Sequence, residues 1–361
     1  MKKSYLMIAA AATLFAACSS NDVFKEIEEQ ETAIGFYPIT GNVTKAAITG
    51  ATPAARLASL ASAGGFKVYG YKTTDSWATA ATIFNGTNVT SANSGADWTY
   101  TGLRFWDKTA TYNFYAVAPN APAGDATYDI EDDPTDADFG MITITGVASA
   151  KSTASNDFLI DRNGATGEQG SAHTSTNNDP VNIEFHHIMA KVGFALKSTL
   201  TSGTITVTEL TMKGWDSGVA TFTQDKTITG APSSLVYGEW AFTSHGSSEI
   251  TLVGTGAGNA SVALTCSASA TATALTDWYI MVPQPIAANT LEFTVTYTYD
   301  DGAGYTETFT DQPAKVTAAQ TWGTDSHTTY TLDIKPAEII FDVTSICDFD
   351  YDGGDHPVTV E

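Results

Sequence analysis

Short segments that alternate apolar and polar residues run along most of this chain, with glycine, asparagine and aspartate between them. A period of two places every second side chain on the same face of an extended strand, so one face can be buried while the other meets solvent. The stretch at 291–299 is followed by DDGAG at 300–304 and a second alternating stretch at 305–309, which predicts a β-hairpin. Further strands are predicted at 66–71, 112–117 and 203–207. The pattern predicts an all-β protein of β-sandwich layers.

One segment near the amino terminus departs from this pattern and predicts a helix. Thr52 can accept a hydrogen bond at the helix start, and Pro53 suits the first turn because it has no N–H to leave unpaired. The alanine-rich stretch from Ala54 to Ala63 favours helix, and the glycine pair that follows favours its end. We therefore expect few short helices among the strands.

A long polar stretch divides the chain. The segment GATGEQGSAHTSTNNDPVN at 164–182 is made of small and polar residues and has no apolar period. Such a stretch is typical of a long loop or a domain boundary. It predicts an N-terminal β-sandwich domain at 34–165 and a C-terminal β-sandwich domain at 182–361, each of ordinary domain size.

The first residues have the pattern of a bacterial export signal. Lys2 and Lys3 precede an apolar or small stretch from Tyr5 to Ala17, which is shorter than the 20 or so residues that span a bilayer. This predicts a signal peptide at 1–17. The sequence LFAAC that ends at Cys18 is similar to a lipobox, in which the cysteine receives a diacylglycerol and becomes the mature amino terminus.

Lipidation of Cys18 would make the protein a lipoprotein, held to the membrane by its acyl chains, palmitate among them. The charged residues that follow make 18–33 a lipidated tether rather than part of a folded domain. The alternative is an ordinary secreted protein in which Cys18 is incidental. Both interpretations place the folded chain outside the cytoplasm.

The charge balance bears on the partners. The chain has 40 acidic residues against 17 lysines and arginines, and loss of Lys2 and Lys3 with the leader takes the net charge from −23 to −25. An acidic surface repels phosphate backbones, so nucleic acid is excluded as a partner. Cys266 and Cys347 remain after Cys18, and the sequence leaves open whether they form a disulfide or stay free.

The sequence contains two clusters of metal-ligating residue types. His186 and His187 are neighbours in a predicted strand, so their rings should point to opposite faces and not share one ion. Asp348, Asp350 and Asp352 alternate before a glycine, as a calcium loop begins, but the twelfth position is a threonine, and a solvated acidic turn is the alternative. The acidic stretch at 131–136 is predicted to be a loop.

The sequence offers little for catalysis. It has no G-x-S-x-G elbow, no phosphate-binding loop and no HExxH pair, so we expect neither an enzyme nor a cofactor, although a site dispersed along the sequence, such as a carboxylate pair, leaves no such motif. Tryptophans could stack on sugars or pack in the core, and the core is the commoner place in a β-sandwich. Among the seven tryptophans are Trp77, Trp98, Trp106, Trp215 and Trp240.

Six short stretches, in order along the chain, resemble the fimbrillin family, the lipoprotein pilins of type V pili in Bacteroidales. They are IGF at 34–36 leading to VTKA at 43–46; FKVYGY at 66–71; FWDK at 105–108 with YNFYAVAP at 112–119; FHHIMAKV at 185–192; IMVPQ at 280–284; and WG at 322–323 with YTLDI at 330–334. The resemblance implies two transthyretin-like β-sandwich domains with Greek-key type connections.

The resemblance also implies a route of assembly. The lipoprotein would be anchored in the cell outer membrane, and a trypsin-like processing protease would then cut between Lys45 and Ala46 and remove the first strand. The subunit would join other pilin subunits head to tail in an extracellular fimbrium. Arg56 is an alternative cutting site, although the predicted helix would shield it. The resemblance is compatible with a stalk, tip or anchor subunit.

The physical consequence of such a cut follows from the sequence. If the segment before Lys45 pairs into a sheet, its loss exposes an apolar groove and an unpaired strand edge. A neighbour's strand can fill that groove, and head-to-tail donation gives a filament because it does not close on itself. The tail at 357–361 is a short candidate donor. The competing hypothesis is a surface lipoprotein that binds glycans through exposed tryptophans and never polymerises.

Overall fold

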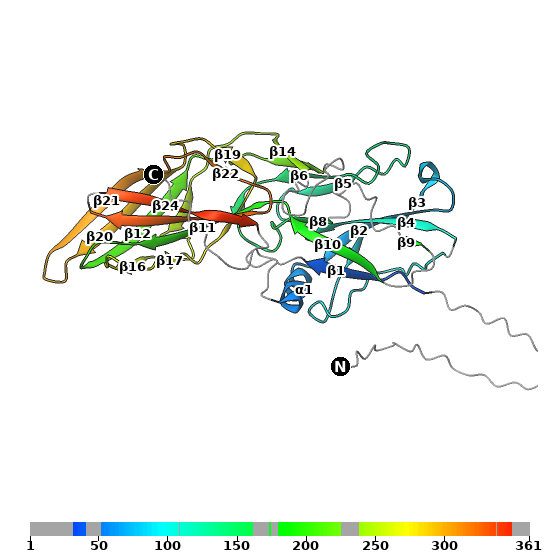
Figure 1. Cartoon of the computed structure of the whole chain (residues 1–361), viewed down its shortest axis with the longest axis horizontal. Helices are drawn as coiled ribbons and strands as arrows, with labels where there is room; N and C mark the ends of the chain where they lie inside the picture. The colour runs from blue at the N-terminus through cyan, green and yellow to red at the C-terminus, as the bar shows by residue number, and fades with distance from the viewer. Residues whose placement is uncertain are drawn as a thin grey trace, which may run out of the picture.

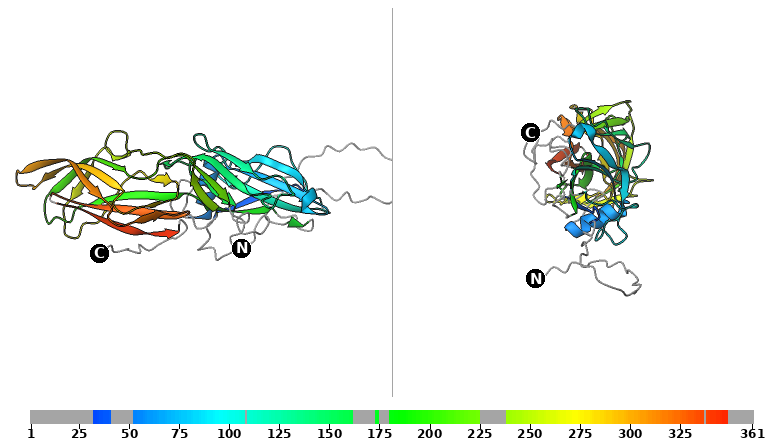
Figure 2. Two further views of the ribbon diagram at one scale, coloured as in Figure 1. Left: turned by 90° about the horizontal axis from the view of Figure 1, so that it is seen from above. Right: turned by 90° about the vertical axis from the view of Figure 1, so that its right-hand side faces the viewer.

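The computed structural model describes residues 32–40, 52–107, 109–161, 173–174, 180–224, 238–336 and 338–348. In this part of the chain the fold is formed by β-strands, the helix α1 (Pro53–Ser62) and a 3-10 turn at Trp77–Thr79. The described body is elongated, with the early strands at one end and the late strands at the other (Figures 1 and 2). The predicted all-β class is confirmed.

The first sheet carries the early strands. Its strands, in spatial order, are β1 (Phe36–Thr40), β10 (Val181–His187), β8 (Leu159–Asp161), β4 (Thr111–Ala118), β2 (Phe66–Thr73) and β3 (Ala81–Val89), with β9 (His173–Thr174) beside β4. A second sheet faces it: β14 (Gly238–Phe242), β13 (Ala220–Gln224), β6 (Ile142–Val147) and β5 (Thr127–Ile130). One buried cluster takes side chains from both sheets, among them Tyr71, Tyr115, Ile144 and Phe222.

The late strands form another pair of sheets. One contains β24 (Glu338–Asp348), β23 (Ser326–Lys335), β11 (Ala190–Lys197), β18 (Tyr279–Met281) and β7 (Ala150–Lys151), with β17 (Thr273–Ala274) beside β11. The other contains β15 (Ile250–Val253), β12 (Thr204–Lys213), β20 (Glu292–Asp300) and β21 (Thr306–Lys315), with β16 (Val262–Thr265) beside β12. Strands β19 (Gln284–Ile286) and β22 (Gln320–Trp322) pair separately. Phe194, Phe293 and Tyr330 lie in the core shared by these sheets.

The locally encoded elements form where the sequence predicts them. Helix α1 begins after Thr52, whose Oγ1 accepts a hydrogen bond from the Ala55 N–H at 3.2 Å, and Gly64 follows its end with a φ of 88°. Strands β20 and β21 form the predicted hairpin, with Asp300 opposite Thr306. The predicted strands at 66–71 and 112–117 lie within β2 and β4. The one at 203–207 lies within β12 except for Gly203, which precedes it.

The sheets do not coincide with the predicted division at 165 and 182. Strand β10 lies in the first sheet between β1 and β8, and β13 pairs with β6 although more than 70 residues separate them. The prediction relied on a polar segment, and local composition says nothing about which distant strands pair. Most of that segment lies outside the described residues. The transthyretin-like layout with Greek-key connections stays a prediction.

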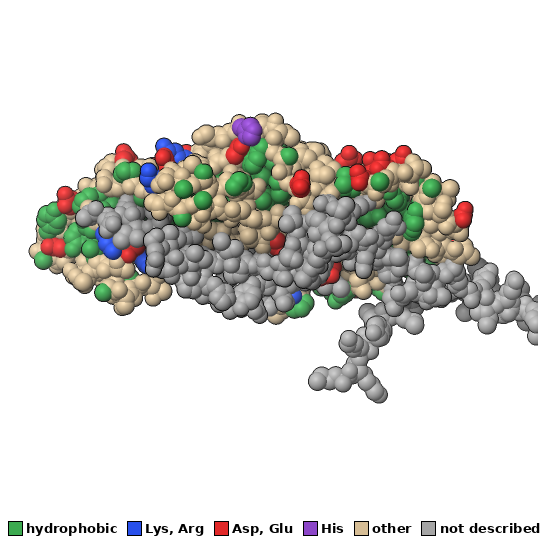
Figure 3. Space-filling model, turned by 45° about the horizontal axis from the view of Figure 1, so that its top comes forward, with side chains coloured by type: hydrophobic (Ala, Val, Ile, Leu, Met, Phe, Trp, Pro, Cys, Tyr) green, Lys and Arg blue, Asp and Glu red, His purple; other side chains and the backbone are tan. Residues whose placement is uncertain are grey.

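Acidic side chains are spread over the surface, and lysines and arginines are few on the face drawn in Figure 3. Among the described residues, no helix has the length and apolar character needed to cross a membrane.

Candidate functional site

The first strand, β1, is the candidate site because it lies before the predicted processing bond and at the edge of its sheet. It pairs in parallel with β10, from Phe36 opposite Val181 to Thr40 opposite Phe185. The Val181 N–H also donates to the Gly35 carbonyl at 2.8 Å. Strand β1 therefore has a neighbour in the sheet on one side only.

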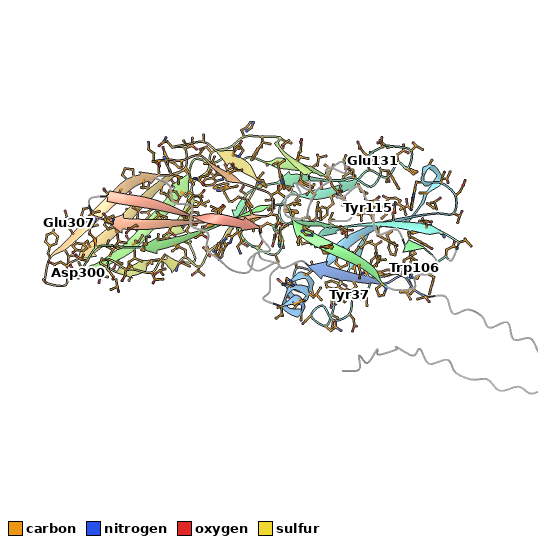
Figure 4. The ribbon with its side chains drawn as sticks, viewed as in Figure 1. Tyr37, Trp106, Tyr115, Glu131, Asp300 and Glu307 are labelled. Carbon is orange, nitrogen blue, oxygen red and sulfur yellow. The ribbon has the colours of Figure 1, made fainter. Side chains whose placement is uncertain are left out.

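The strand alternates between core and solvent. Ile34, Phe36 and Pro38 are buried, whereas Tyr37 is 48% exposed and points away from the sheet core (Figure 4). This is the period-two pattern of a strand with one buried face. The segment therefore combines a buried side with an edge position, which are the two properties that make a strand both stabilising and separable.

Phe36 occupies an aromatic cluster. Its ring centroid lies 5.2 Å from that of Phe84, 5.6 Å from Phe114 and 5.7 Å from Tyr100, each in an edge-to-face arrangement that aromatic rings favour. Strands β1 and β3 are at opposite ends of the sheet order, yet Phe36 of β1 contacts Phe84 of β3. The first sheet is therefore strongly curved, and β1 closes it over its own core.

A glycine makes room for this cluster. Gly70 is in β2, and a Cβ atom there would lie 2.7 Å from the Phe84 ring and 3.0 Å from the Phe114 ring. Real Cβ atoms do not approach other atoms that closely, so a larger residue would displace the two rings that hold Phe36. The FKVYGY stretch thus contributes directly to the aromatic cluster around Phe36.

The segment 99–106, called here the closing segment, covers the gap between β1 and β3. The Ile34 N–H donates to the Arg104 carbonyl at 2.8 Å, and the Trp106 N–H donates to the Thr32 carbonyl at 3.0 Å. The Tyr100 hydroxyl donates to the Ile34 carbonyl at 2.7 Å. Burial raises the pKa of Tyr100, so the hydroxyl keeps its proton and can donate at neutral pH.

The sequence predicts only the end of this closing segment, where Phe105 and Trp106 belong to the FWDK stretch. Its residues, TYTGLRFW, have no period of two, and Leu103 and Phe105 are exposed while Trp106 is buried. Besides the FWDK stretch, its aromatic residues were the available signal. Figure 4 labels Tyr37 on β1 and Trp106 in the closing segment, both at the end of the molecule that carries the early strands.

The modification sites predicted from the sequence have different outcomes. Cys18, Lys45 and Ala46 lie outside the described residues, so lipidation and processing stay predictions. Arg56 lies inside α1 and is buried. Because proteases act on exposed, flexible chain, this position supports the expectation that the helix shields Arg56.

The FHHIMAKV stretch contributes to the interior. His187 and Asp157 are both fully buried, and the His187 Nδ1 lies 2.6 Å from the Asp157 Oδ1. His186 has a different carboxylate nearby, with its Nε2 3.5 Å from the Glu184 Oε1. Within the described residues, no three or more histidine, cysteine, aspartate or glutamate side chains are arranged to hold a metal ion.

The acidic stretches are surface features where they are described. The stretch at 131–136 lies in the loop between β5 and β6, and Glu131 is labelled in Figure 4. The hydroxyl and N–H of Thr135 donate to Asp133 and lower the pKa of its carboxyl group. Asp348 is the last residue of β24, and the remainder of the candidate calcium loop lies outside the described residues.

The tryptophans are buried or half-buried, and Cys266 is buried. All seven tryptophans are described, and none of them is among the exposed large apolar side chains. Trp322 is almost fully buried, and the Trp240 Nε1 donates to the Ile188 carbonyl at 3.0 Å. Cys266 is a buried free thiol, which is one of the two alternatives that the sequence left open. A sugar-stacking platform of exposed tryptophans is therefore not favoured.

Comparison with known proteins places the chain in a family. The model of the fimbrillin-like family matches residues 44–348, so the chain belongs to the fimbrillin-like family. The resemblance seen in the six short stretches is thereby confirmed. No curated protein matches the sequence.

The chain is similar to several solved structures, and the first of these supports the fold. A fimbrial protein from Bacteroides vulgatus has 20% sequence identity and a TM-score of 0.61, over 88% of this chain and 99% of that chain. A proposed cell adhesion protein from Bacteroides uniformis has 13% identity and a TM-score of 0.43, over 88% and 100% of the two chains. A fimbrial assembly protein from Parabacteroides distasonis has 12% identity and a TM-score of 0.37, over 88% and 98%.

Proposed function

We propose that this protein is a structural or adhesive subunit of a cell-surface pilus, exported as a lipoprotein, cut after Lys45 and assembled by exchange of β-strands. The observation that carries the proposal is the position of β1, which is a buried edge strand on the amino side of Lys45. Membership of the fimbrillin-like family supports the pilus-type role. No catalytic step is part of this function.

The physical argument for exchange rests on what β1 covers. Its departure would leave the Phe84 and Phe114 rings facing solvent and would free the edge of β10. Exposed apolar surface and an unpaired edge both favour binding of another strand. A strand from a neighbouring subunit would restore the main-chain hydrogen bonds and bury alternate side chains, which is β-augmentation.

The donor strand would come from the other end of a neighbour. The residues after β24 are the candidate, and Val358 and Val360 alternate within the last five residues of the chain. Donation from one subunit to the next does not close into a ring, so it extends a filament. A tip or anchor subunit accepts or donates at one end only.

Cutting at Lys45 should convert the monomer into larger assemblies. We expect limited trypsin treatment of the purified, unlipidated precursor to cut after Lys45 and to give oligomers on sizing, whereas Lys45→Gln stays uncut there and monomeric. Lys67→Gln, which changes a lysine within β2, is the matched control and should behave as the unmodified protein. A cut protein that remains a monomer under all conditions would contradict the stalk role.

Cys18→Ser tests the lipid anchor. Because a serine hydroxyl is not the acceptor of the diacylglycerol, labelling with an alkyne fatty acid should disappear and less protein should reach the surface. The fold of 34–361 should be unchanged, since the tether lies outside it. Cys266→Ala is the control and should keep its label. Persistent labelling of Cys18→Ser would show that the lipid is attached elsewhere.

A further inference from the structure

We propose that the closing segment is a latch on the first strand, with Tyr100 as the positioning residue that sets how fast this strand leaves after the chain is cut. This inference rests on the proposed function, because it concerns the release step of strand exchange. With such a latch, cutting of the chain and release of the first strand are two distinct events, and the cut after Lys45 does not by itself release the strand.

The latch is fixed at both of its ends. At the start, the N–H groups of Thr99 and Thr90 each donate to the other residue's carbonyl at 2.9 Å, which joins the segment to the end of β3. At the other end, the buried Trp106 ring packs against Tyr112 with 4.8 Å between the ring centroids. None of these contacts involves the first strand, so they persist when that strand leaves.

The middle of the latch is held against β3 by Arg104. Its Nε donates to the Ile83 carbonyl at 3.2 Å, and its guanidinium lies over the Phe84 ring at 5.9 Å from the centroid. A cation over an aromatic face is attractive. These contacts place the Arg104 carbonyl beside the first strand, where it accepts the hydrogen bond of the Ile34 N–H.

The latch holds the first strand through the backbone around Ile34. Both polar groups of the Ile34 backbone are engaged, the N–H by Arg104 and the carbonyl by the Tyr100 hydroxyl. The Tyr100 ring also packs against Phe36. Hydrolysis of the bond after Lys45 breaks none of these contacts, because they all involve residues 32–36. The cut strand therefore stays bound until the latch yields.

The same contacts define the kind of partner that replaces the first strand. The Arg104 carbonyl, the Trp106 N–H and the Tyr100 hydroxyl contact main-chain atoms of residues 32–34, so they read an extended backbone and not a particular side chain. Phe84 and Phe114 then select an apolar side chain at the position of Phe36. The partner is an extended β-strand with an apolar residue two positions beyond the backbone that the latch holds.

Tyr100→Phe tests the latch because it removes the hydroxyl and keeps the ring. Tyr128→Phe is the matched control: its hydroxyl donates to the Pro119 carbonyl, also at 2.7 Å, but on β5 in the opposing sheet. Loss of the hydrogen bond to Ile34 should change a rate by roughly 3- to 10-fold. Tyr100→Phe also removes the oxygen that accepts the Arg104 N–H at 3.2 Å, a contact within the latch itself. The unlipidated precursor is used for both variants and for the unmodified protein.

Two measurements are made on each protein. In the uncut precursor, amide hydrogen exchange over residues 32–40 should be roughly 3- to 10-fold faster in Tyr100→Phe and unchanged in Tyr128→Phe. After complete trypsin cutting, the half-time for loss of the peptide that ends at Lys45, followed by sizing, should shorten by the same factor in Tyr100→Phe alone.

The outcomes separate the latch from the proposed function. Equal exchange over 32–40 in the two variants would overturn the latch, whatever happens after cutting. Faster exchange in Tyr100→Phe with an unchanged release half-time would overturn its role in release. An unmodified protein that never loses the cut peptide would contradict strand exchange, and the exchange data on the uncut precursor would still decide whether Tyr100 holds the strand.

Discussion

Phe36→Ala is expected to lower the free energy of unfolding of the uncut precursor by about 3–5 kcal/mol, the usual cost of truncating a buried phenylalanine. The ring is buried and makes edge-to-face contacts with Phe84, Phe114 and Tyr100. Alanine would leave a cavity at the place where the curved first sheet closes. Urea unfolding of the unlipidated precursor measures the difference.

Tyr37→Ala is the matched control for Phe36→Ala. Tyr37 is the next residue of the same strand but faces solvent, so its replacement should change the free energy of unfolding by no more than about 0.5 kcal/mol. Equal destabilisation by the two variants would contradict the inward position of Phe36. Once the first strand has been cut and lost, neither substitution should affect the stability of the remaining body.

His187→Ala should destabilise the protein by a similar amount, about 3–5 kcal/mol, as expected when one partner of a buried charged or hydrogen-bonded pair is removed. His187 and Asp157 are both fully buried, and the substitution takes away a 2.6 Å partner of the Asp157 carboxyl group while opening a cavity. Thermal or urea unfolding with one probe in each half of the chain gives the change.

The chain supplies a matched surface pair as the control. His245 is hydrogen-bonded to Asp216, but its side chain is 80% exposed. His245→Ala should therefore leave the free energy of unfolding nearly unchanged, because water can replace the hydrogen bond that the histidine makes to Asp216. A large loss of stability in His245→Ala, or none in His187→Ala, would mean that burial is not what makes the His187 pair important.

The elements that could be predicted from the sequence depend on neighbouring residues. Thr52, Pro53 and the glycine pair after Ala63 specify where α1 begins and ends, and the Gly-rich turn at 300–304 specifies the hairpin of β20 and β21. In each case the controlling interactions, such as the Thr52 cap, join residues a few positions apart. A window of about ten residues therefore contains the information that fixes where each of these elements begins and ends.

The elements that could not be predicted depend on distant partners. The family resemblance implied an early strand at 34–36, but the parallel pairing of β1 with β10 joins residues about 145 positions apart. The adjacent histidines predicted alternation along a strand, but not which carboxylate each ring would lie near. Asp157, the partner of His187, lies 30 positions earlier in the sequence. The closing segment has no period at all, because its side chains contact two different neighbours, the residues just before β1 and strand β3.

The crossing of the chain between the two pairs of sheets has a mechanical consequence. The chain passes from one pair to the other between β6 and β7, between β7 and β8, between β10 and β11, between β12 and β13 and between β14 and β15. A force along the long axis of the body is thus shared by several parallel covalent connections, unlike the force on two domains joined by one linker. Tension on such a unit acts on whole sheets in shear, and a single linker never carries the entire load.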